Sequence, residues 1–336
     1  MKLNKLALGM GLSLGLMAAV SAQTVIKLGY ATSATSHYAV GSTVFCDEVE
    51  KGTQGRYKCQ QFPNGSLGGE REMIEAVQLG TLDLVNTSTG PVGNFVPEVK
   101  IVDIPFLFRD YEHARKVMDG EIGQDILTKF PAKGLVALGW TENGFRHMTN
   151  SKRAIVKPGD AAGLKMRTME NKVHMDGYKT FGIQPTPMAF PEVFGALQQG
   201  TVDGQENPVN LFLAFKMDTL AQRHLSVWNY CADAGIFHVA KPVFDSFSAQ
   251  DREIVVESAR EAARLLKSGG FFIASMDYWF EKIPTDDIKM FDMIWTIFSA
   301  GEIQSFIDLA RAHGLQPHGP LQFEGRDHPI SCLDRN

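Results

Sequence analysis

Two arginines stand where side chains could bind a carboxylate. Arg167 follows the apolar residues Leu164 and Met166 near the end of a predicted strand, and Arg146 closes a short Asn-Gly-Phe-Arg stretch. A guanidinium presents parallel N–H donors that match the two oxygens of a carboxylate, whereas lysine offers only a point charge. Spacing alone nevertheless favours a surface position for Arg167, paired with Glu170. Arg146 could equally be a structural arginine.

Catalytic motifs are absent from the sequence. It has no GxSxG elbow, no GxxxxGK loop, no HExxH helix and no GxGxxG after a strand. The nine histidines lack metal-ligand spacing, and carboxylate pairs such as Glu70 with Glu72 are expected on solvated faces. The residues therefore favour binding over catalysis, and neither a cofactor nor a metal ion is expected.

The N-terminus has the pattern of a secretory signal peptide. Lys2 and Lys5 precede an apolar run that ends in small residues, which predicts cleavage after Ala22 and export to the periplasm. Residues 1–22 are too short an apolar stretch to span a membrane. Without them the formal charge falls from −5 to −7, because both lysines leave, so nucleic acid is not expected as a partner.

The remaining 314 of the 336 residues alternate between strand-like and helix-like patterns. Strands are predicted at 25–30, 57–62 and 82–85, with helices over 38–51 and 73–79 between them. Further segments alternate from 135 to 239, and a long helix follows over 249–267. This order predicts an α/β protein, and its length favours two lobes.

The four cysteines lack CxxC spacing, which argues against structural zinc. Cys46 and Cys59 flank a short loop between a predicted helix and a predicted strand. An exported protein can oxidise such a pair, so a disulfide is favoured over two buried thiols. Cys231 and Cys332 are expected to be separate, and the sequence leaves their state open.

Several ordered stretches resemble the DctP-type periplasmic solute-binding proteins of tripartite ATP-independent (TRAP) transporters. The stretches are 62–68 (FPNGSLG), 80–83 (GTLD), 103–106 (DIPF), 142–146 (ENGFR), 163–167 (GLKMR), 185–190 (PTPMAF) and 202–208 (VDGQENP). The resemblance runs from about Val25 to Lys267 and fades after about Trp279.

The resemblance implies a two-lobed periplasmic solute-binding fold with a hinge and a long helix spanning the lobes. Residues 23–143 and 233–272 would form the first lobe, and 144–232 and 273–336 the second. It also implies that Arg167 clamps a ligand carboxylate, with Asn207 beside it. Arg146 matches a second arginine found in part of the family.

Polar residues after two strands of the first lobe are expected to discriminate between ligands. His37 and Asn86 are the favoured candidates from these loops, although capping and turn chemistry would explain most members. Ser88 stands where the sialic-acid-binding branch carries an acidic residue, which disfavours that ligand. Glu206 is expected to be structural, because an unpaired carboxylate beside an anion would weaken binding.

The favoured function is capture of a small organic acid anion, a sugar acid such as a uronate or aldonate, for delivery to TRAP permease subunits in the membrane. The binding subunit is expected to be a monomer. Two alternatives stay open: an exported enzyme, such as a lyase using His37 or a carboxylate, and a binding protein that reports to a receptor.

Overall fold

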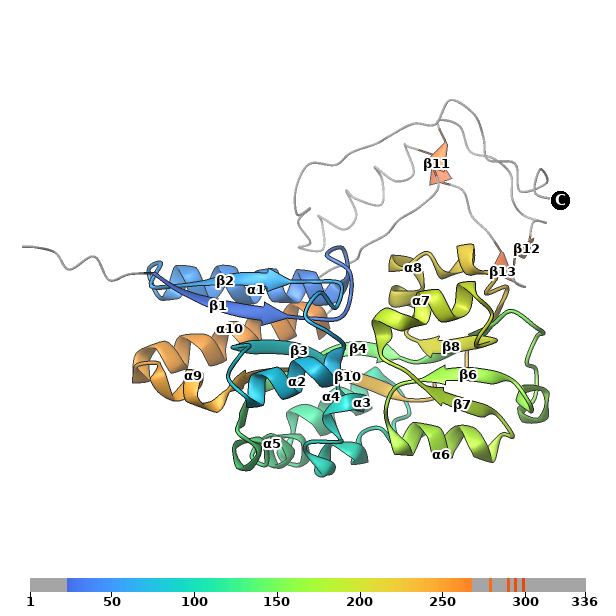
Figure 1. The fold of residues 1–336 in the computed structure, drawn as a ribbon, viewed down its shortest axis with the longest axis horizontal. Helices are drawn as coiled ribbons and strands as arrows, with labels where there is room; N and C mark the ends of the chain where they lie inside the picture. The colour runs from blue at the N-terminus through green and yellow to red at the C-terminus, as the bar shows by residue number, and fades with distance from the viewer. Residues whose placement is uncertain (1–22, 268–277, 280–288, 291–292, 295–297, 300–336) are drawn as a thin grey trace, which may run out of the picture.

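The computed structural model describes residues 23–267, 278–279, 289–290, 293–294 and 298–299 (Figure 1). The predicted signal peptide, Cys332 and most of the chain after Lys267 lie outside these residues. The described part of the chain forms two lobes, each built on a mixed five-stranded sheet.

The sheet of the first lobe has the strand order β2-β1-β3-β10-β4. Its strands are β1 (Thr24–Gly29), β2 (Tyr57–Phe62), β3 (Leu84–Ser88), β4 (Leu135–Phe145) and β10 (Ala232–Ala240). β1 is parallel to β2 and β3, whereas β10 is antiparallel to both β3 and β4.

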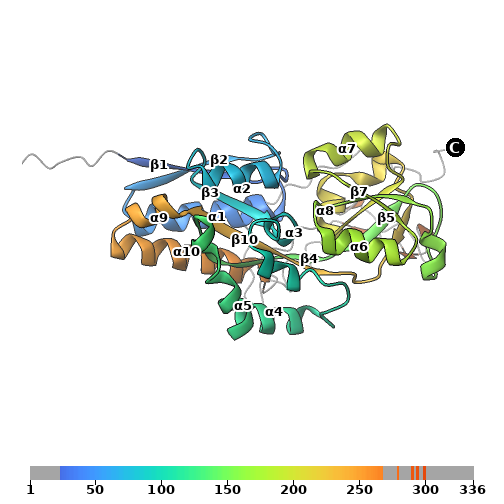
Figure 2. The same cartoon turned by 60° about the horizontal axis from the view of Figure 1, so that its bottom comes forward.

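Helices cover both faces of this sheet (Figures 1 and 2). One face carries α1 (His37–Gly52) and α10 (Ala249–Lys267), which follows α9 (Lys241–Ser246); the other carries α2 (Glu70–Gln78), α3 (Thr89–Val92), α4 (Tyr111–Asp119) and α5 (Glu121–Leu127), with 3-10 turns at Pro97–Ile101 and Phe130–Lys133. Each face buries its own apolar cluster, so the sheet separates two cores.

The second lobe repeats this layering on a smaller scale. Its strands are β7 (Gln184–Pro187), β6 (Lys165–Thr168), β8 (Gly204–Asn207), β5 (His147–Asn150) and β9 (His224–Ser226), in that order across the sheet. Its helices are α6 (Lys172–Thr180) on one face and α7 (Phe190–Gln198) and α8 (Val209–Ala214) on the other, with 3-10 turns at Pro158–Ala161 and Met217–Leu220. The short strands β11 to β14 span Tyr278–Trp279, Lys289–Met290, Met293–Ile294 and Phe298–Ser299.

Within residues 23–267, two segments carry the chain between the lobes. The first is Arg146, which separates β4 from β5, and the second leads from β9 to β10. The two segments pair through their backbones, because Arg146 N donates to Cys231 O at 2.9 Å and Tyr230 N donates to Arg146 O at 3.1 Å. The lobe boundaries expected at 143/144 and 232/233 stay a prediction.

The α/β class and the two-lobed architecture predicted from the sequence are confirmed. The last of the alternating segments, 227–239, forms a strand only from Ala232 onward; Trp228 and Tyr230 precede this strand and stack with ring centroids 4.7 Å apart. Over its described length, α10 packs against α1 and β4 of the first lobe. None of the helices within the described residues is both long and apolar enough to cross a membrane.

The predicted disulfide is present. Cys46 on α1 and Cys59 on β2 are bridged, with their Cα atoms 5.5 Å apart. Cys231 is a buried free thiol. The bridge ties the helix to the edge strand that follows it.

Reduction of this disulfide should lower the free energy of unfolding by about 3 kcal/mol, because it releases a loop closed across 13 positions in the unfolded chain. Urea unfolding with and without dithiothreitol measures the difference. The double variant Cys46→Ser, Cys59→Ser is the control and should be insensitive to dithiothreitol. Equal stability of the reduced and oxidised wild type would contradict the prediction.

Candidate functional site

A small, nearly filled cavity lies where the lobes meet. Both lobes contribute side chains, and several of them stand at the carboxyl ends of strands, where α/β sheets present ligand groups. Its lining consists of Ala31, Thr32, Tyr38, Glu70, Ser88, Asn143, Arg146, Arg167, Met169, Phe190, Asn207 and Leu211.

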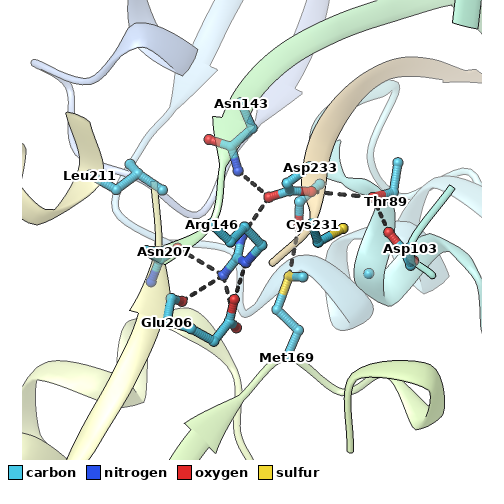
Figure 3. A network of polar contacts seen from close by, with 12 residues as sticks. Thr89, Asp103, Asn143, Arg146, Met169, Glu206, Asn207, Leu211, Cys231 and Asp233 are labelled. Atoms are coloured by element: carbon cyan, nitrogen blue, oxygen red, sulfur yellow. Dashed lines mark hydrogen bonds and ion pairs between the residues drawn. The ribbon is translucent and has the colours of Figure 1, made fainter. Parts of the chain in front are cut away.

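Arg146 lies at the centre of a buried ion-pair network (Figure 3). Its side chain is only 1 % exposed and binds the carboxylates of Glu206 on β8 and Asp233 on β10, both fully buried. Nη2 also donates to the side-chain oxygen of Asn207 at 3.0 Å. Burial alone would lower the pKa of Arg146, but the two carboxylates raise it well above its usual value.

The network continues away from the cavity. The Thr89 hydroxyl lies 3.2 Å from Asp233 and donates to Asp103 at 2.6 Å, and Asp103 also accepts from Asn171 at 2.6 Å. Asn171 caps α6 of the second lobe. Arg146 therefore holds the lobe junction, as the structural alternative expected, while also contributing to the cavity wall.

Arg167 has a different environment. It is 2 % exposed, and its Nε and Nη2 donate only to the backbone oxygen of Met188, at 3.1 and 2.9 Å. Its ring partner is Phe190, whose centroid lies 5.7 Å from the guanidinium carbon. Among the described residues, no carboxylate forms an ion pair with Arg167, and Nη1 has no hydrogen-bond partner.

The surface alternative for Arg167 is wrong. Glu170 pairs instead with Arg71 of the first lobe, at 3.6 Å. Burial lowers the pKa of Arg167 to about 10, which still leaves it charged at neutral pH. A desolvated cation without a carboxylate partner is costly, so this end of the cavity is prepared for an anion.

The other residues singled out by the sequence fall into two groups. Asn207 and Ser88 line the cavity with the arginines. His37 lies at the edge of the site, where its ring nitrogens contact Asn143 Oδ1 at 2.8 Å and Asn210 Nδ2 at 3.2 Å. Asn86 is buried within β3 and is not part of the lining. Ligand contacts by all four stay predictions.

Local structure explains part of this arrangement. Ser36, in the polar loop after β1, accepts a hydrogen bond from Ala39 N and so caps α1, which begins at His37. Burial lowers the pKa of His37 to about 4 despite its contact with Asn143, so the ring is neutral at neutral pH. Through its contact with Asn210, His37 links the first lobe to α8 of the second lobe.

The expectation that Glu70 belongs to a solvated face is wrong. Glu70 is the first residue of α2, and its carboxylate lines the cavity and accepts from Ser88 N at 2.7 Å and Ser88 Oγ at 2.9 Å. Burial raises its pKa to about 7, although the Ser88 hydrogen bonds oppose the shift. Glu72, two positions along, is exposed. Nothing in the sequence around Glu70 and Glu72 indicated that one would be buried and the other exposed.

Three potential metal ligands meet behind the cavity. The ligand atoms of Asp103, His174 and Cys231 lie within 4.8 Å of one another, and all three residues are buried. Both Asp103 oxygens already accept hydrogen bonds, and burial lowers the pKa of His174 to about 3, with Arg146 and Arg167 adding to the shift and Asp233 opposing it. Because the Asp103 oxygens are already engaged by Thr89 and Asn171, the cluster is better described as buried polar packing.

Replacement of Arg146 by methionine should lower the free energy of unfolding by about 3 to 5 kcal/mol, because Glu206 and Asp233 would stay buried without a cation. Urea unfolding measures this loss. Arg115→Met is the matched control: Arg115 pairs with Glu142 at 2.6 Å but is 37 % exposed, so the loss should be about 1 kcal/mol or less. Equal losses in the two variants would contradict the structural role of Arg146.

Comparisons with known proteins agree with this fold and site. The family model described as bacterial extracellular solute-binding protein, family 7 (DctP) matches residues 28–268. A solute-binding protein of Verminephrobacter eiseniae is 55 % identical over 263 residues, which cover 78 % of each chain. The 2,3-diketo-L-gulonate-binding periplasmic protein of Escherichia coli is 35 % identical, over 70 % of this chain and 72 % of that protein.

A solved structure supports the same relationship. A TRAP periplasmic solute-binding protein from Polaromonas, bound to D-erythronate, is 55 % identical and superposes with a TM-score of 0.72, covering 87 % of this chain and 96 % of that one. By sequence and by structure, this chain belongs to the DctP family of TRAP solute-binding proteins.

Proposed function

We propose that the chain binds a small hydroxylated carboxylic acid, a sugar acid, between its lobes and delivers it to the membrane subunits of a TRAP transporter. The ligand carboxylate lies against Arg167, with Asn207 and Arg146 beside it. Binding involves no covalent step, so the ligand leaves chemically unchanged. The signal peptide is removed during export to the periplasm.

The buried guanidinium of Arg167, which has no carboxylate partner within the described residues, is the observation that carries this proposal. Nη1 is buried at the cavity wall without a partner in the described chain, while Arg146 nearby is neutralised by two protein carboxylates. A carboxylate from outside the chain is the group that would complete the charge and hydrogen bonding of Arg167.

The polar lining supports a hydroxylated ligand. Thr32, Tyr38, Ser88 and Asn143 offer hydroxyl and amide groups to the cavity. The relatives support the same class, since one is named for 2,3-diketo-L-gulonate and another was solved with D-erythronate.

Exchange of Arg167 for lysine should weaken binding of D-erythronate by roughly 2 to 5 kcal/mol, because lysine keeps the charge but loses the planar pair of donors. Isothermal titration calorimetry measures the affinity, and mass spectrometry of the released ligand tests that it is unchanged. If D-erythronate does not bind, the best ligand from a panel of aldonates and uronates replaces it.

Arg223→Lys is the matched control, since Arg223 is an exposed arginine of the second lobe, outside the cavity. It should bind as the wild type does. An Arg167→Lys affinity within about threefold of the wild type, which is less than about 1 kcal/mol, would refute the clamp. Failure of every acid in the panel to bind the wild type would refute the proposed function.

A further inference from the structure

Glu70 is a second charged group of the cavity that lacks an ion-pair partner. Within the described residues, no lysine, arginine or histidine forms an ion pair with its carboxylate. Its two oxygens are instead oriented by the backbone N–H and the hydroxyl of Ser88. Ser88 ends β3 and immediately precedes α3, so the carboxylate is fixed between α2 and the end of a central strand.

The cavity is therefore electrically asymmetric. The charge of Arg146 is already balanced by Glu206 and Asp233, which leaves Arg167 as the cation available to a ligand. Glu70 lines the same cavity and supplies a carboxylate that can contact a ligand. Arg167 comes from the second lobe and Glu70 from the first, so a ligand between them meets one charge from each lobe.

This asymmetry distinguishes between classes of acid. A carboxylate oxygen that already accepts one hydrogen bond retains a lone pair for another, so Glu70 can accept from a ligand hydroxyl. A ligand with a second carboxylate would place two like charges close together in a site of low dielectric. The same side chain would thus bind the hydroxyl of a monocarboxylic acid and oppose the second carboxylate of a dicarboxylic acid.

We infer that Glu70 is the specificity-determining residue of this site: it accepts a hydrogen bond from a hydroxyl of a monocarboxylic acid and repels dicarboxylates. The inference rests on the proposed function, because it assumes that Arg167 holds the first carboxylate. Ser88 acts as a positioning residue, since it orients Glu70 from both its backbone and its side chain.

The test compares D-erythronate with succinate, two four-carbon acids that differ in hydroxyls and in the second carboxylate. Calorimetry at pH 8 keeps Glu70 ionised, because burial raises its pKa only to about 7. For Glu70→Gln, the preference for D-erythronate over succinate should fall at least about tenfold relative to the wild type. Glu72→Gln, a change at an exposed carboxylate of the same helix, should keep that preference within about threefold.

A second arm uses only the wild-type protein and so does not depend on the folding of a variant. Succinamate has the shape of succinate but carries a neutral amide in place of one carboxylate. The wild type should bind succinamate at least about tenfold more tightly than succinate, and this gap should close in a folded Glu70→Gln variant.

The outcomes separate this inference from the proposed function. If the wild type binds D-erythronate through Arg167 but binds succinate as tightly as succinamate, Glu70 does not set specificity and the inference is overturned, while the proposed function stands. An unchanged preference in folded Glu70→Gln overturns it equally. If neither D-erythronate nor any other sugar acid binds the wild type, the proposed function itself fails.

Discussion

The ion pairs of Arg146 with Glu206 and Asp233 are the interaction on which the rest of the site depends. The three charges come from the crossing between β4 and β5, from β8 and from β10, so they join both sheets where the chain passes between them. Because all three are removed from water, losing one would leave an uncompensated buried charge. The need to keep these charges paired holds the two crossing segments together and fixes the position of Arg146 in the cavity lining.

The same network determines which charges remain available to a ligand. Glu206 and Asp233 both form ion pairs with Arg146, and within the described residues neither forms one with Arg167. Arg167 therefore remains a buried cation whose Nη1 has no partner within the described residues. An incoming carboxylate meets donors that are already oriented, so little reorganisation is needed when it binds.

The sequence predicted those features that depend on local pattern or on a strong motif. Alternating strand and helix patterns gave the α/β class, and the loop between α1 and β2 gave the Cys46–Cys59 disulfide. The partners of Arg146 could not be predicted in the same way, because they lie 60 and 87 positions further along the chain. The position of Glu70 could not be predicted for a related reason: only the fold shows that Glu70, at the start of α2, lines the cavity while Glu72 in the same turn faces solvent.

Arg146 and Arg167 illustrate how one residue type serves stability at one position and binding at another. Both are almost fully buried arginines beside the same cavity, but protein carboxylates satisfy the first and a backbone oxygen only partly satisfies the second. An unsatisfied buried donor lowers the stability of the unliganded protein, and that cost is recovered when a ligand supplies the missing acceptor. Arg167 therefore favours ligand binding because the chain supplies neither a carboxylate for its charge nor an acceptor for its Nη1 within the described residues.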